Sequence, residues 1–247
     1  MNITFCTASH IGNKRKTNED SLFAQQQNDG SILLAVADGM GGMPGGKDAA
    51  AMATNAFSKL GNAAALTPHQ LAYIAMEGHN NIQQYSELHP EMDGMGTTLT
   101  AALLQDEVIS WVHVGDSRLY LLRDKKLKQL TTDHRFLSSM LIAGDISPEE
   151  ARHHPLRNML DQCLGCPDIQ MEQGGAPLYP GDSLLLCTDG LHDELSFEEL
   201  EEVLNKTNMV LASKAETLLR LALEAGGKDN ITIIIAECGE TPSIPRR

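Results

Sequence analysis

Positive charge is scarce in this chain of 247 residues. Lysine and arginine together number 19 against 33 aspartates and glutamates, which gives a formal net charge of −14. Proteins that bind nucleic acid through its phosphates, or that adhere to anionic membranes, normally show the opposite balance. The composition therefore predicts no nucleic-acid partner and no membrane partner. It also raises the question of which acids serve a chemical purpose.

Long apolar runs are also missing. The longest, such as residues 231–236, fall far short of the roughly 20 residues that a membrane-spanning helix needs. The first five residues lead into polar sequence, so the apolar core of a secretory signal is not seen there. We therefore expect a cytoplasmic protein, with no sensor or membrane segment after its last strand.

Cysteine is infrequent and odd in number, with five residues scattered along the chain. Cys163 and Cys166 form a lone C-x-x-C pair without a second pair or a neighbouring histidine, which is weak support for zinc or redox chemistry. In a reducing compartment, we expect these two residues to be ordinary thiols.

Hydrophobic residues make up 42% of the sequence, enough for one folded core, and no repeat or linker divides it. We therefore predict a single domain over residues 1–247. Apolar runs rich in β-branched residues predict strands at 32–37, 97–104, 108–114, 119–122, 127–130, 183–187 and 231–236. Helical spacing predicts helices at 47–60, 69–88, 135–143, 148–153, 197–206 and 212–225. Because the strands gather mid-chain and the helices occur in blocks, we expect an α+β fold in which mostly antiparallel sheets are covered by helices.

Four aspartates lie where buried strands begin or end. Asp38, Asp116 and Asp189 follow apolar runs, and Asp229 immediately precedes one. A carboxylate in such a place is costly unless it is paired, hydrogen-bonded or bound to metal. A single one usually caps a turn, but four suggest strand ends that converge on one pocket. Their mutual repulsion would be relieved by a divalent cation, and ligation by oxygen alone favours Mg²⁺ or Mn²⁺.

A cation lies beside further acids near the N-terminus, where Arg15 is followed by Glu19 and Asp20. An arginine beside a metal pair can grip phosphate oxygens through two hydrogen bonds. Taken alone, the segment would be read as an exposed charged turn. Residues 41–47 fit the G-x-x-x-x-G-K pattern of a nucleotide-binding loop, but Asp48 stands where such a loop needs Ser or Thr, so we discount it.

Short motifs recur in a fixed order along more than two hundred residues of the chain. They are Arg15 with 18–20, 36–42, 94–98, 113–120, 130–134, 146–151 with His154, Pro155 and Asn158, 188–191, and 229–232. Any one tripeptide is weak support, whereas the ordered set makes the chain resemble the metal-dependent Ser/Thr protein phosphatases of the PPM (PP2C) type, in their compact bacterial form.

The resemblance implies a four-layer α-β-β-α sandwich of two antiparallel sheets flanked by helices, with two Mn²⁺ or Mg²⁺ ions at one end. By motif, Asp38 would bridge the metals, the Gly39 carbonyl would bind one, and Asp189 and Asp229 would bind the other. Asp20 would act through a metal-bound water, and Asp116 with Asp189 matches a weaker third metal site. Arg15 would bind the substrate phosphate, so the resemblance assigns catalysis to Arg15, Asp38 and Asp189.

The same resemblance implies hydrolysis of phosphoserine and phosphothreonine by direct attack of a metal-bridging water. Residues from about 135 to 155 match the family's flap, a variable segment that influences substrate choice. Two departures stand out. Met40 replaces a histidine proposed as the general acid in animal relatives, and residues 159–165 differ from the usual Thr-Arg-Ala-Leu-Gly ending.

The implied partners are phosphorylated proteins and a cognate bacterial Ser/Thr kinase, and the family favours a monomer. Two alternatives stay open from the sequence. One is a catalytically silent relative that only binds phosphoproteins, which should have lost a metal acid. The other is a phosphatase of an anti-sigma-factor antagonist, whose branch usually lacks this flap pattern.

Overall fold

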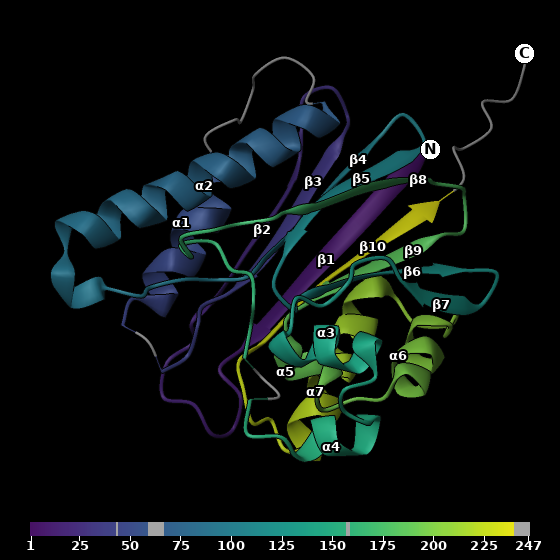
Figure 1. The fold of residues 1–247 in the computed structure, drawn as a ribbon. Coiled ribbons are helices and arrows are strands. Elements are labelled where there is room, and N and C mark those ends of the chain that lie inside the picture. The colour runs from purple at the N-terminus through teal and green to yellow at the C-terminus, as the bar shows by residue number, and fades with distance from the viewer. Residues whose placement is uncertain (43, 59–66, 157–158, 240–247) are drawn as a thin grey trace, which may run out of the picture.

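Two antiparallel sheets of five strands each form the centre of the described part of the chain (Figure 1). The computed structural model describes residues 1–42, 44–58, 67–156 and 159–239. The first sheet has the order β1-β10-β9-β6-β7: β1 (Asn2–His10), β10 (Ile231–Gly239), β9 (Ser183–Cys187), β6 (Arg118–Arg123) and β7 (Lys126–Gln129). The second has the order β2-β3-β4-β5-β8: β2 (Asp20–Gln26), β3 (Ile32–Asp38), β4 (Leu99–Gln105), β5 (Val108–Val114) and β8 (Glu172–Pro177).

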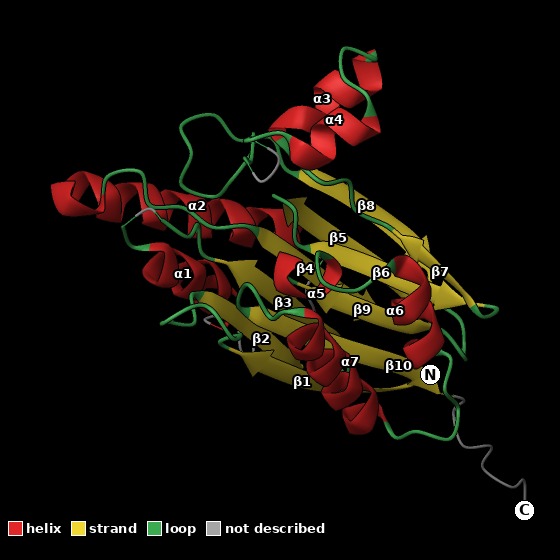
Figure 2. Cartoon of the chain, turned by 90° about the horizontal axis from the view of Figure 1, so that it is seen from below, coloured by secondary structure: helices red, strands yellow, loops and turns green. Residues whose placement is uncertain are grey.

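Helices cover the outer face of each sheet, as Figure 2 shows from below. The second sheet carries α1 (Gly46–Ser58) and α2 (Pro68–Leu88), which is followed by the 3-10 turn η1 (Pro90–Met92). The first sheet carries α5 (Asp189–His192), α6 (Phe197–Leu204) and α7 (Leu211–Ala225). Two short helices, α3 (Phe136–Ala143) and α4 (Pro148–His153), pack on each other beyond the ends of the strands. No helix among the described residues has the length and apolar character needed to pass through a lipid bilayer.

Burial on both faces explains why the central strands read as continuous apolar runs. In β3, Ile32, Leu34 and Val36 pack between the sheets, while Leu33, Ala35 and Ala37 pack under α1 and α2. A third apolar cluster fills the space between the first sheet and its helices. Strands buried on both faces lose the apolar–polar alternation of half-exposed ones. The predicted four-layer α-β-β-α sandwich is confirmed.

The six predicted helices begin within one residue of their expected starts, whereas α5 was not predicted. Ser196 accepts a hydrogen bond from the Glu199 backbone at 3.3 Å, and the Glu199 carboxylate accepts from the Ser196 backbone at 2.8 Å, which completes a capping box before α6. The last two residues of the helix predicted at 47–60 lie outside the described residues.

The prediction that Cys163 and Cys166 are ordinary thiols is wrong, because the structure joins them in a disulfide. Gly165 adopts a positive φ of 97° between them, and this turn brings their Cα atoms to 5.4 Å, within the range that a disulfide can bridge. The intervening Leu164 exchanges two backbone hydrogen bonds with Thr97, at 2.9 and 3.1 Å. The disulfide loop is thereby fixed to the chain just before β4.

Candidate metal centre

Two of the predicted metal ligands lie opposite each other at the end of the second sheet. Asp20 is the first residue of β2, Asp38 is the last of β3, and the antiparallel register pairs them directly. The Asp38 backbone N–H donates to Thr98 Oγ1 at 2.9 Å, and its carbonyl accepts from Thr97 Oγ1 at 2.8 Å. The strand pairing and these hydrogen bonds hold both carboxylates at one edge.

The first sheet brings two more acids to the same place. Asp189 opens α5 directly after β9, and Asp229 lies just before β10. Gly190 is required next to Asp189 because a Cβ there would overlap the Asn230 carbonyl oxygen. Thr188 Oγ1 donates to Asp20 Oδ2 at 2.9 Å and thus joins the two sheets across the site.

The backbone of Gly39 is also presented here. Its N–H donates to the Glu19 carbonyl at 3.2 Å, and it forms an isolated bridge with Thr97. A side chain at this position would collide with the Gly46 carbonyl. The chain can therefore bring Gly39 beside the acids only because it is glycine.

The electrostatics of the cluster are unfavourable without a cation. Burial, and then the charges of Asp20, Asp189, Asp116 and Asp229, raise the pKa of Asp38 well above its ordinary value. Burial and the neighbouring carboxylates also raise the pKa of Asp189, and burial raises that of Asp20 to about 7. Carboxylates crowded in this way favour either protonation or a bound positive charge.

The donor set fits a hard divalent cation. Among the described residues, Asp20 Oδ1 and Asp189 Oδ1 are buried carboxylate oxygens without a hydrogen-bond partner. Buried hydrogen-bond acceptors without a partner cost free energy. All the atoms that could bind a metal here are oxygens, which come from Asp20, Asp38, Asp189, Asp229 and the Gly39 carbonyl. Such a set suits Mg²⁺ or Mn²⁺.

Arg15 reaches the same cluster from the loop between β1 and β2. Its Nη2 lies 2.5 Å from Asp229 Oδ2, and its side chain is 40% exposed. A guanidinium that is both exposed and attached to an acid of the cluster can turn its remaining N–H groups toward an incoming anion.

Asp116, the acid matched to a third metal site, has a different environment. Its side chain is 6% exposed, and its Oδ2 accepts a hydrogen bond from Arg135 Nε at 3.0 Å. Arg135 Nη2 also donates to Asp193 Oδ1 at 3.1 Å. We did not single out Arg135 or Asp193 as site residues from the sequence. The four-residue spacing from Asp189 to Asp193 was a signal for the second, since that spacing places both on one face of a helical turn.

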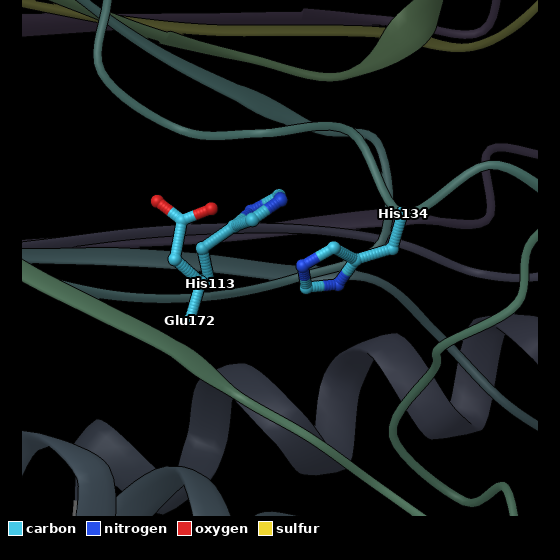
Figure 3. Close-up of side chains that lie close together, drawn as sticks. All are labelled: His113, His134 and Glu172. Atoms are coloured by element: carbon cyan, nitrogen blue, oxygen red, sulfur yellow. The ribbon is translucent and has the colours of Figure 1, made fainter. Parts of the chain in front are cut away.

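A second group of potential ligands lies on β5, on β8 and on the loop between β7 and α3 (Figure 3). His113, His134 and Glu172 offer ligand atoms within 4.8 Å of one another. Glu172 is paired with His113 across the strands, and His134 points toward His113 from the other side. The two imidazole centroids are 4.9 Å apart.

The side chains of His113, His134 and Glu172 already form hydrogen bonds within the protein. His134 Nδ1 accepts from the Gly115 backbone N–H at 3.2 Å, so the neutral ring carries its proton on Nε2, the nitrogen facing His113. His113 contacts Thr100 Oγ1 at 2.9 Å and the Thr132 carbonyl at 3.1 Å, as expected of a satisfied core histidine. Glu172 accepts from the Thr132 backbone at 2.8 Å. We assign this group to holding the loop of residues 131–135 rather than to metal binding.

Comparison with known proteins places this arrangement in context. Residues 6–224 match the family model described as protein phosphatase 2C. The chain is 37% identical over 241 residues to the serine/threonine protein phosphatase PstP of Mycobacterium tuberculosis, covering 95% of this chain but 45% of that protein. It is 37% identical over 233 residues to the serine/threonine phosphatase stp of Listeria monocytogenes, with 92% of each chain covered.

A solved structure carries the same fold. The catalytic domain of PstP in complex with two manganese ions superposes with a TM-score of 0.85 at 34% identity, over 96% of this chain and 99% of that one. The chain thus spans about half of the full mycobacterial protein and nearly all of its solved catalytic domain.

Proposed function

Since this chain belongs to the protein phosphatase 2C family, we propose that it is a metal-dependent protein phosphatase that hydrolyses phosphoserine and phosphothreonine esters. The observation that carries the proposal is the set of four aspartates delivered by the ends of two sheets to one place. Two of them keep a buried oxygen without a partner in the described structure. PstP, which is similar over its catalytic domain, binds two manganese ions.

Asp38, Asp189, Asp229 and the Gly39 carbonyl would hold two divalent cations, with Asp20 contributing through water. Two such ions would activate a water for attack on phosphorus and offset the charge of the phosphoryl oxygens. Thr97 and Thr98 fix the Asp38 backbone, so its carboxylate is already oriented before a cation arrives. We propose direct attack by water because two bound ions would activate it, and because the Thr188 hydroxyl beside these acids already donates its hydrogen bond to Asp20 Oδ2. Met40, next to Gly39, has no proton to give to a leaving group.

Arg15 is the proposed phosphate ligand. Its contact with Asp229 holds the guanidinium beside the acid cluster, and its exposure leaves donors for two substrate oxygens. The charge of Asp229 would be shared with a bound cation, which loosens its hold on Arg15 and frees that side chain for substrate.

Residues 135–155 are the proposed flap, and α3 and α4 occupy most of that segment. Phosphorylated proteins are the proposed substrates, on the strength of the names of the relatives. A partner kinase, a monomeric state and a cytoplasmic location stay predictions from the sequence.

The competing function is a silent relative that only binds phosphoproteins. The test is release of inorganic phosphate from a phosphothreonine peptide, measured with Mn²⁺ and then with excess EDTA. We expect release that requires Mn²⁺ and stops on chelation. The matched control is the same peptide carrying phosphotyrosine, which should be a far poorer substrate. A folded protein that binds Mn²⁺ yet releases no phosphate from any phosphopeptide would favour the silent binder.

A further inference from the structure

The first residue of the proposed flap places a positive charge among carboxylates at the border of the metal centre. Arg135 Nε lies 3.0 Å from Asp116 Oδ2 and 3.8 Å from Asp133 Oδ2, and its Nη2 lies 3.1 Å from Asp193 Oδ1. The Arg135 side chain is 19% exposed, so this guanidinium is largely enclosed by its partners.

Backbone contacts fix Arg135 in this position. The preceding residue, His134, donates its N–H to the Gly115 carbonyl at 2.7 Å, directly beside Asp116. Arg135 itself forms an isolated bridge with Leu160, and the next residue donates to the Met159 carbonyl at 2.8 Å. The group of His113, His134 and Glu172 holds the same loop from the other side. The side chain of Arg135 therefore has little freedom to leave.

Asp116 and Asp193 border the core of the centre. The Asp116 carbonyl lies 3.0 Å from His192 Nε2, which places Asp116 against α5, the helix that opens with Asp189. Asp193 follows Asp189 by one helical turn. The resemblance matched the third metal to Asp116 and Asp189, so a cation held between Asp116 and Asp193 would take one of that site's two acids and lie one helical turn from the other.

We propose that Arg135 takes the place of the third cation, so that this chain binds two divalent ions and keeps a guanidinium where a third would bind. The inference rests on the proposed function, because it takes the two-ion centre as given. The guanidinium satisfies both carboxylates, and a metal ion could bind them only by expelling it. The flap is thereby tied to the metal centre by a permanent ion pair instead of an exchangeable ion.

The test counts bound Mn²⁺ per chain by equilibrium dialysis with elemental analysis, and by titration calorimetry. We expect two ions for the wild type and three for Arg135→Gln. Adding Asp116→Asn to Arg135→Gln should return the count to two, because the gained site loses a ligand. Arg123→Gln is the matched control. Arg123 donates two hydrogen bonds, of 2.9 and 2.6 Å, to Asp182. This pair lies at the ends of β6 and β9 that are away from the acid cluster, so the change frees a buried acid without creating a metal site. It should leave the count at two.

Arg135→Met, which keeps the aliphatic stem, gives the same expected result if the glutamine variant is unfolded by circular dichroism. Three ions in the wild type, or two in both folded Arg135 variants, would overturn the inference while leaving the proposed function intact. A folded wild type that binds no Mn²⁺ would overturn both.

Discussion

At the scale of single residues, Asp189 is the acid on which the proposed chemistry depends most directly. It follows Thr188, whose hydroxyl links the two sheets through Asp20, and one of the Asp189 oxygens is buried without a partner in the described structure. We expect Asp189→Asn to lower turnover by roughly a hundredfold or more, because a neutral amide holds a divalent cation poorly. Circular dichroism should show an intact fold. Activity equal to that of the wild type would disprove the assignment of Asp189 to the metal.

Arg15 acts at the same scale but on the substrate. Arg15→Ala should raise KM for a phosphothreonine peptide and change kcat less, since it removes a group that binds the phosphate before and during reaction. Steady-state kinetics at saturating Mn²⁺ measure both constants. Arg15→Lys should recover part of the loss, because a lysine offers the charge without the paired donors. An unchanged KM in the alanine variant would remove Arg15 from the phosphate-binding role.

His113 predicts a pH dependence of stability. Burial, and then the neighbouring His134, lowers its pKa from 6.5 to about 4 in the folded protein. In the unfolded chain His113 binds a proton near pH 6.5, whereas in the folded chain it binds one only near pH 4. The free energy of unfolding therefore decreases as the pH falls from 6.5 toward 4. The loss is on the order of 3 kcal/mol.

Urea unfolding of the wild type and of His113→Gln across that range isolates this contribution. The variant keeps a donor for the Thr132 carbonyl but has no titrating ring. Parallel pH profiles for the two proteins would show that His113 does not carry the dependence.

At the scale of elements, the loop closed by Cys163 and Cys166 supports the strand ends that carry the metal ligands. Gly165 has a φ of 97°, and a Cβ there would collide with the Met95 carbonyl. Gly181 has a similar φ of 94° with open space around it. Gly165→Ala should therefore cost more stability than Gly181→Ala, whose backbone strain alone is about 1 kcal/mol. Equal losses in urea unfolding would show that the loop yields easily.

The elements that the sequence predicts best are those buried on both faces. The strands β3, β9 and β10 are easily recognised because each contains an unbroken apolar run, at 32–37, 184–187 and 233–236. The strands β1, β2 and β8 were missed because their many half-exposed and polar positions interrupt any apolar run. The fourth outermost strand, β7, was predicted from the short run at 127–130. Edge strands are marked by pairing partners, which a single sequence does not reveal.

Some features of the candidate site could be predicted from the sequence and others could not. The acids at strand ends were predictable because a carboxylate stands out against a buried apolar run. The contacts of Arg135 with Asp116 and Asp193 were not, because they depend on the path of a loop that returns to the sheets. The disulfide was missed because two cysteines at this spacing pair only when a turn such as that at Gly165 brings them together.

At the scale of the whole molecule, the proposed metal centre spans the boundary between the two sheets. Asp20 and Asp38 lie at strand ends of one sheet, and Asp189 and Asp229 lie next to strand ends of the other. A cation bound by these acids would therefore hold the two sheets together at that end, where the bare acids repel one another. Because only the folded chain assembles the site, Mn²⁺ at a hundred times its dissociation constant should raise the free energy of unfolding by about 2.7 kcal/mol per site.

Urea unfolding with Mn²⁺, and again with EDTA, measures this difference. Asp189→Asn is the control and should respond much less to the ion. A wild type whose unfolding midpoint is the same in both conditions would show that the ions do not bridge the sheets.

The ring closed by Cys163 and Cys166 has a practical consequence. Leu164, inside the ring, pairs with Thr97, which in turn donates to the Asp38 carbonyl. A thiol reductant that reached these sulfurs would open this ring. The oxidised and reduced forms are two covalent species that differ by two hydrogen atoms. The difference lies next to Leu164, whose partner Thr97 holds the backbone of Asp38. A rate measured in one buffer describes one species, and the two should be compared only after the state of these cysteines has been established by mass spectrometry.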